Sequence, residues 1–162
     1  KGFTVQTLSS DTIASQAAGG SWSSGGALNT GKYGGYGVGS GNDNNLNVTG
    51  YSGPSRTNTV ESYNGSSWTS APSLINARRN RPGGAGTTTA ALVFGGIVDP
   101  GASNSTATEG YDGTSWSTRP SLGTARYGLG GAGTATALIA YEPDALVAAD
   151  AIELPLEPSA RK

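Results

Sequence analysis

Two sixteen-residue stretches of this chain are nearly identical. YNGSSWTSAPSLINAR covers residues 63–78 and YDGTSWSTRPSLGTAR covers residues 111–126, so the second copy follows the first by 48 positions. Recurrence at a period of roughly 20–50 residues is typical of architectures that repeat one small structural unit several times. We therefore expect a series of similar units, each packed against its neighbours.

Three tryptophans set the register of the repeat, with spacings of 46 and 48 residues. Each Trp is followed six positions later by a Leu and ten positions later by a cation, and the second and third Trp are preceded by a Glu and a Tyr. The recurring residues, all expected to be structural, are Trp22, Trp68, Trp116, Leu28, Leu74, Leu122, Lys32, Arg78, Arg126, Glu61, Glu109, Tyr63 and Tyr111. We expect Glu153 to be the Glu of the last unit.

Composition and local pattern predict an all-β fold. Gly contributes 27 of the 162 residues, which favours turns and short strands over helices. Residues 87–96 and 134–141 are β-prone, and two short alternating segments lead into Asn64-Gly65 and Asp112-Gly113, which are strong tight-turn signals. The stretch DALVAADAIEL at 144–154 is compatible with a helix, but we favour a strand because its end matches the Glu-bearing segments.

These features resemble kelch repeats, the units of kelch-type β-propellers. Gly95-Gly96, Tyr111 and Trp116 reproduce the Gly pair, Tyr and Trp of such units. The glycine-rich composition resembles that of kelch-like arrays in phage tail-fibre and bacterial surface proteins. In the first unit, VTGYSG stands in place of the Gly pair. In the last unit, Ala140-Tyr141 stands in place of it. The resemblance covers about residues 12–157 and implies short antiparallel sheets, about three blades, in a partial or oligomer-completed β-propeller.

The expected organisation is an N-terminal strand segment at 1–21, which is exchanged or closes the array, followed by three repeats. The repeats span about 22–67, 68–115 and 116–162. The absence of an initiator Met before Lys1 suggests a processed or partial chain. The sequence contains no run of 18 apolar residues, so it does not indicate a membrane span.

Charge and composition argue against several functional classes. Charged residues make up 13% of the chain and the net charge is −1, which gives no attraction to nucleic acid or an anionic membrane. The chain has no His and no Cys, so the resemblance cannot extend to the copper site of the galactose oxidase group. DGTSW lacks the spacer of a sialidase Asp box, and GLGGAG has no helix after it to bind a phosphate.

We therefore expect no enzymatic activity, no catalytic residue, no metal site and no cofactor. The polar loop GNDNN at 41–45 could hold Ca²⁺ through oxygen ligands, but a solvated turn is the favoured interpretation. Each Trp is expected to pack between neighbouring blades. Arg78 and Arg126 are expected to form partly buried pairs with Glu61 and Glu109 and to bind loop carbonyls.

Three sequons mark candidate glycosylation sites at Asn47, Asn64 and Asn104, and we expect them in exposed loops. In a chain so rich in Asn, Ser and Thr, three sequons can also arise by chance.

Three units are too few to close a propeller, for which at least about four are usual. An open array would leave a strand edge and an apolar blade face uncovered. Completion within the chain is one solution, and completion by a terminal strand of another copy, giving a ring or a filament, is the other.

The leading hypothesis is a non-enzymatic structural subunit of an extracellular, cell-surface or virion assembly, such as a fibre, filament or appendage, whose partners are other copies of itself. The alternative is a glycan-binding propeller module for surface attachment, with a surface polysaccharide as partner. Candidate sugar-stacking residues are Tyr33, Tyr36, Tyr51 and Tyr127. A third hypothesis is an enzyme fragment that lacks its remaining blades.

Overall fold

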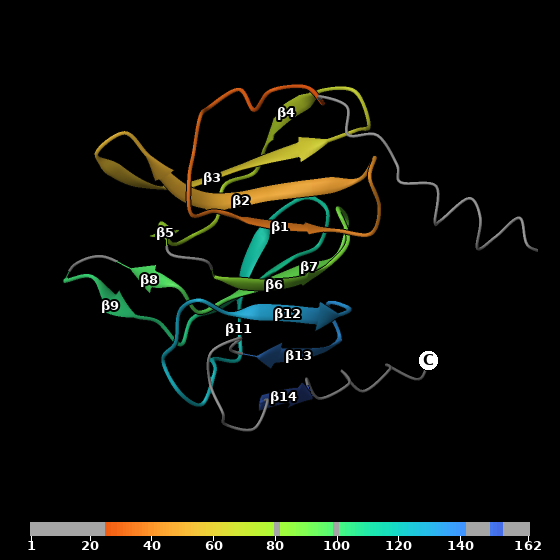
Figure 1. Cartoon of the computed structure of the whole chain (residues 1–162). Helices are drawn as coiled ribbons and strands as arrows, with labels where there is room; N and C mark the ends of the chain where they lie inside the picture. The colour runs from red at the N-terminus through yellow and green to blue at the C-terminus, as the bar shows by residue number, and fades with distance from the viewer. Residues whose placement is uncertain (1–24, 80–81, 99–100, 142–149, 154–162) are drawn as a thin grey trace, which may run out of the picture.

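The computed structural model describes residues 25–79, 82–98, 101–141 and 150–153 (Figure 1). Every regular element among these residues is a β-strand, and every strand pair is antiparallel. The prediction of an all-β fold is confirmed. The strands form three sheets, and each contains a meander; the three meanders follow one another along the chain.

The first sheet is an up-and-down meander with a short extension. Its meander consists of β1 (Tyr36–Gly39), β2 (Asn45–Ser52), β3 (Ser55–Tyr63) and β4 (Trp68–Ala71). Because β3 is long, the edge that pairs with β4 also pairs with β5 (Arg78–Arg79), which continues to β8 (Ile97–Val98) and β9 (Ser103–Asn104). These three short strands link the first sheet to the loops of the second.

The second and third sheets repeat the meander. The second consists of β6 (Gly83–Gly86), β7 (Ala91–Phe94), β10 (Thr108–Tyr111) and β11 (Trp116–Arg119) in sequence order. The third consists of β12 (Gly130–Gly133), β13 (Ala137–Tyr141) and β14 (Asp150–Glu153). Among the described residues, β14 pairs with β13 alone.

The first strands of the three sheets lie together. β6 lies beside β1 on one side and β12 on the other, as the orange, green and blue arrows in the middle of Figure 1 show. Glycine makes this approach possible: a Cβ on Gly131 would lie 2.5 Å from the carbonyl oxygen of Gly84. Tyr36 adds a direct link, because its hydroxyl accepts a hydrogen bond from the Gly131 amide at 3.2 Å.

Two hydrophobic clusters fill the spaces between consecutive sheets. The first cluster, between the first and second sheets, contains Val38, Leu46, Val48, Val60, Leu74, Ala91, Val93, Tyr111 and Trp116. The second cluster, between the second and third sheets, contains Ala85, Leu92, Phe94, Leu122, Leu129 and Ala140. β7 supplies alternate residues to both clusters, which explains why its sequence, ALVF, is apolar throughout.

The predicted turns are present at both near-identical stretches. Asn64 and Asp112 begin the turns that join the last two strands of the first and second sheets, and Gly65 and Gly113 both have φ of 92°. The side-chain oxygens of Asn64 and Asp112 accept amide hydrogen bonds from the residues two and three positions later. The tight-turn prediction is therefore confirmed.

The backbone conformation of the Gly pair recurs in the first unit, although the sequence there has no Gly pair. Gly95 and Gly96 have φ of 65° and 85°, and the corresponding residues, Thr49 and Gly50 within β2, have φ of 59° and 120°. The first unit thus keeps the conformation with a Thr in place of one Gly. In the third sheet, strand register aligns Ala140-Tyr141 with Val93-Phe94, so our placement of the last Gly pair there is wrong. The aligned positions, 142–143, lie outside the described residues.

The expectation that Glu153 is the Glu of the last unit is also wrong. Asn47 faces Glu61 and Val93 faces Glu109, and the equivalent residue of β13, Ala140, faces Asp150. Asp150, and not Glu153, therefore occupies the repeated acidic position. The strand preference for the 144–154 segment is confirmed for Asp150–Glu153, and the rest of that segment lies outside the described residues.

Candidate functional site

The repeated Trp residues connect consecutive units. Trp116 Nε1 donates a hydrogen bond to the Pro72 carbonyl at 2.8 Å, and Trp68 Nε1 donates to the Gly26 carbonyl at 3.0 Å. The acceptors occupy the same position in the repeat, four residues after a Trp. Trp116 is buried in the cluster between the first and second sheets, as predicted for a Trp between units, whereas Trp68 is half-buried. Trp22 lies outside the described residues.

The repeated Glu residues bind the loop that precedes their own sheet. Glu109 accepts hydrogen bonds from the amides of Ile75 and Asn76 at 2.7 and 3.2 Å. Glu61 accepts from Asn29 and Thr30 at the same two distances. Each carboxylate therefore fixes the connection between two units.

A cation completes each of these connections. Arg78 forms an ion pair with Glu109 and donates two further hydrogen bonds of 3.0 Å, to the carbonyls of Gly95 and Ala107. Lys32 takes the same place beside Glu61, at 3.6 Å, and donates to the Thr59 carbonyl. The expected Arg–Glu pair with loop carbonyls is thus present at Arg78 and joins Glu109, while Glu61 pairs with Lys32.

Burial lowers the pKa of both cations. Desolvation is the main cause for Arg78 and Lys32, and the carboxylates of Glu109 and Glu61 act in the opposite direction. These charged groups recur in step with the repeat and are occupied by structural contacts.

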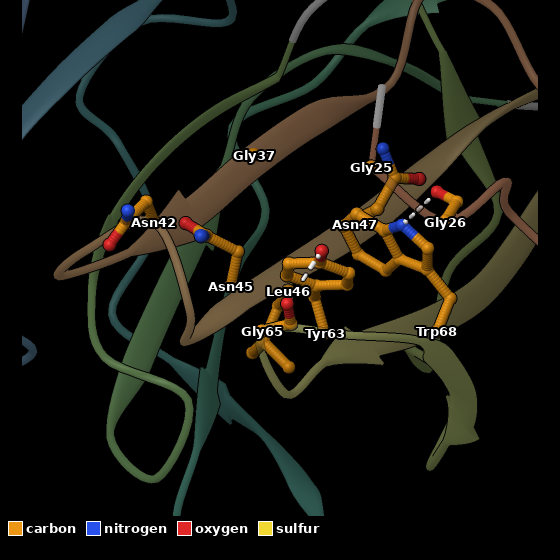
Figure 2. Close-up of a pocket in the computed structure, with 10 residues that line it drawn as sticks. All are labelled: Gly25, Gly26, Gly37, Asn42, Asn45, Leu46, Asn47, Tyr63, Gly65 and Trp68. Carbon is orange, nitrogen blue, oxygen red and sulfur yellow. Dashed lines mark hydrogen bonds between the residues drawn. The ribbon is translucent and has the colours of Figure 1, made fainter. Parts of the chain in front are cut away.

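A pocket lies on the face of the first sheet that turns away from the second sheet. It has a volume of about 660 Å³. The residues that line it are Gly25, Gly26, Gly37, Asn42, Asn45, Leu46, Asn47, Tyr63, Gly65 and Trp68. Figure 2 shows Asn42 and Asn45 at one end, Trp68 and Gly26 at the other, and Tyr63 between them. We call this site the Trp68 pocket.

The two aromatic residues of the Trp68 pocket are held in place by their own polar atoms. Tyr63 and Trp68 face each other across β3 and β4, with ring centroids 4.9 Å apart and ring planes inclined by 35°. The Tyr63 hydroxyl donates to the Gly65 carbonyl at 3.0 Å, and the Trp68 indole donates to Gly26. The rings therefore form a fixed platform.

A second hollow lies where the three first strands meet. Equivalent residues of β1, β6 and β12 surround a cavity of about 170 Å³. At one end, the turns that follow these strands line a depression of about 440 Å³, with Ser40, Thr87, Thr134 and Thr136 among its residues. The hydroxyls of Thr134 and Thr136 lie 3.1 Å apart and bond within their own turn, so we regard this depression as a weaker candidate.

The four tyrosines considered for sugar stacking do not form one surface. Tyr33 and Tyr127 are 65% and 51% exposed, but Tyr36 is used between β1 and β12. Tyr51 packs between Tyr33, at 5.2 Å between ring centroids, and the Arg79 guanidinium, at 5.6 Å. Nothing in the sequence alone marks Tyr63 and Trp68 as a binding platform, because their recurrence indicates a structural role only.

The three sequons lie in different environments. Asn64 is exposed in a turn, where its side-chain oxygen accepts two amide hydrogen bonds, and Asn104 is exposed on β9. Asn47 differs from the expectation of an exposed loop, because it lies within β2, is half-buried and lines the Trp68 pocket.

Within the described ranges, no three His, Cys, Asp or Glu side chains gather as metal ligands. Asn45 of the GNDNN loop instead donates a hydrogen bond to the Gly41 carbonyl. The described residues also contain no helix that is long and apolar enough to cross a membrane.

No protein-family model matches the chain, and no curated protein matches it either. The functional argument therefore rests on the residues and their arrangement.

Proposed function

We propose that this chain is a kelch-like partial β-propeller that acts as a non-enzymatic structural subunit of an extracellular, cell-surface or virion assembly. The three meanders correspond to three blades, with β1, β6 and β12 as the innermost strands around a common axis. The observation that carries the proposal is the recurrence of the same inter-unit contacts at Trp68 and Trp116 and at Glu61 and Glu109. Such nearest-neighbour contacts are what an array of blades needs.

The third sheet supplies the argument for self-association. In the first and second sheets the third strand pairs with a fourth that begins at a Trp, whereas β14 has only β13 as partner among the described residues. The sequence after β14 contains Pro155 and Pro158 and no aromatic residue, so it does not resemble β4 or β11. The segment WSSG at Trp22 does resemble WTSA of β4. We propose that this segment of one copy adds to β14 of the next.

Composition supports the proposed surroundings and role. The chain has no Cys and no Met, and only 13% of its residues are charged. Such a chain offers few side chains to oxidation, which suits a part that is exposed outside the cell.

The test is the solution mass of the full chain, measured by light scattering and accompanied by negative-stain images. We expect multimers that appear as rings or filaments. A compact, stable single chain at the highest accessible concentration would overturn the proposal. Trp22→Ala is expected to reduce the mass to that of one chain while the circular dichroism of the strands persists.

Two proline variants of β14 provide a matched pair. Because successive amides of an antiparallel strand point to opposite edges, one of Ala151 and Ile152 donates toward β13 and the other toward the free edge. We expect Ala151→Pro and Ile152→Pro to differ accordingly: one blocks association and leaves a folded monomer, whereas the other destabilises the third sheet. Association that survives both changes would exclude this edge.

A further inference from the structure

The repeat provides an internal control for the Trp68 pocket. The equivalent face of the second sheet is covered by the first sheet, which buries Tyr111 and Trp116. A Cβ on Gly84, the residue of β6 equivalent to Gly37, would lie 2.7 Å from Val38 Cγ2 of the first sheet. A Cβ on Gly37 would have no neighbour within 4 Å among the described residues. Within the part of the chain that the structure describes, the space that a sheet fills in one unit is therefore open in the other.

The floor of the open face has a different chemistry from that of its covered counterpart. Strand register aligns Asn45 and Asn47 of β2 with Ala91 and Val93 of β7. A second apolar sheet packs well on Ala91 and Val93, but it would strip water from two amides at the equivalent places without replacing their hydrogen bonds. The substitution thus favours a polar occupant over another sheet.

The two amides are not equally explained by the fold. Asn45 has a structural contact through its hydrogen bond to Gly41. Asn47 Oδ1 is buried and has no hydrogen-bond partner among the described residues. A buried acceptor without a donor destabilises a fold. Stability therefore does not account for an Asn at this position, whereas a hydrogen-bonding ligand that reorients the amide does.

We propose that the Trp68 pocket binds a neutral saccharide. The residues that line it include none with a charge. An aromatic platform beside side-chain amides suits a sugar, because the rings contact its apolar C–H face while each amide can both donate to and accept from hydroxyl groups. The volume of about 660 Å³ falls within the range of about 300–1,000 Å³ that is usual for small-molecule sites.

The proposed binding surface differs from the proposed self-association surface, because the pocket lies on the first sheet and the β14 edge belongs to the third, and the two share only Gly25, which ends the WSSG segment and lines the pocket. A saccharide site would let an assembled subunit also attach to a surface polysaccharide. The two proposals can fail separately, since one is measured by ligand binding and the other by mass.

The test uses the full chain and a panel of neutral tetrasaccharides built from glucose, mannose, galactose or N-acetylglucosamine. Binding is measured by saturation-transfer NMR and by calorimetry. We expect at least one member to bind. The key variant is Asn45→Ala/Asn47→Val, which copies the covered face of the second sheet. It is expected to weaken binding by at least about tenfold while the circular dichroism of the strands persists.

Two further variants sharpen the result. Gly37→Val places a side chain in the open space and is expected to abolish binding, whereas Asn104→Ala, on the exposed β9, is expected to leave binding unchanged. The proposal is overturned if no panel member binds, or if the double Asn variant binds as tightly as the unaltered chain. It is also overturned if Gly37→Val dissociates multimers in the absence of sugar binding, because the face would then be an interface between copies.

Discussion

Arg78 and Glu109 form an ion pair inside the connection between the first and second sheets, with only 0% and 1% of their side chains exposed. Among the described residues, the hydrogen-bonding partners of this pair are backbone groups, the other member of the pair and the Asn76 side chain. The pair thus replaces apolar packing at a point where three loops meet, and its removal should disturb both sheets.

Glu109→Gln is expected to destabilise the chain by about 3–5 kcal/mol, because it leaves the Arg78 charge buried without a counter-charge. Urea unfolding, followed by tryptophan fluorescence, measures the effect. Glu61→Gln is the matched control and should cost less, because the Lys32–Glu61 pair is longer, at 3.6 Å. Equal losses in the two variants, or a loss below 1 kcal/mol for Glu109→Gln, would contradict this account. The 1 kcal/mol limit is roughly the value of one ordinary hydrogen bond.

The glycines of the first strands give a second prediction. Gly131→Ala would bring a Cβ to 2.5 Å from the Gly84 carbonyl oxygen and 2.9 Å from Phe94 Cζ, so β6 and β12 must move apart. We expect a loss of about 1–3 kcal/mol, as for other overpacked sites. Gly37→Ala, at the equivalent position of β1, meets no neighbour within 4 Å among the residues that the structure describes and should change stability by no more than about 0.5 kcal/mol. Thermal unfolding of both variants measures the two losses of stability. Similar losses would show that packing does not distinguish the two positions.

The sequence predicted the hairpin that ends each of the first two meanders, together with the contacts of its recurring side chains. The Tyr and Trp of each hairpin, the turns at Asn64 and Asp112, and the pairing of a cation with a Glu all leave a recurring signal. That signal arises because the same side chains are needed at the same place in each unit.

The first strand of each meander was not predicted. Strands β6 and β12 have the sequence GGAG, and glycine is depleted in strands because it adds no packing side chain. Here a bare backbone is required at Gly84 and Gly131, where a Cβ would lie 2.7 Å from Val38 Cγ2 and 2.5 Å from the Gly84 carbonyl oxygen. Local propensity cannot detect a requirement that arises only when distant strands meet.

The Trp68 pocket could not be predicted from the sequence for a related reason. The expectation was an apolar uncovered face, and the open face of the first sheet instead contains Asn45 and Asn47. The signal is a departure from the repeat at these two positions, but it becomes visible only when strands are aligned by register. Spacings of 46 and 48 residues between Trp residues leave that alignment ambiguous in the sequence.

The turn at Asp112 provides a prediction about pH. Its carboxylate accepts amide hydrogen bonds from Thr114 at 2.8 Å and Ser115 at 2.7 Å, and these bonds lower the pKa of Asp112 below its usual 3.8. A carboxyl group with a lowered pKa in the folded state contributes stability that is present above its unfolded pKa and is lost as the pH falls through the folded value. Asn64 makes the same two contacts, at 3.0 Å each, with an amide that does not titrate.

Asp112→Asn should therefore lower the melting temperature at pH 6, where the ionised carboxylate makes stronger hydrogen bonds than an amide does. The difference from the unaltered chain should shrink as the pH falls below 3.8, since protonation removes the advantage of the carboxylate. Asn64→Asp is the reciprocal control, and it should create a second acid-sensitive turn on the exposed hairpin of the first sheet. Melting curves from pH 6 to pH 2 measure both effects. A difference between Asp112→Asn and the unaltered chain that stays constant over this range would mean that the two turn hydrogen bonds do not depend on the charge of Asp112.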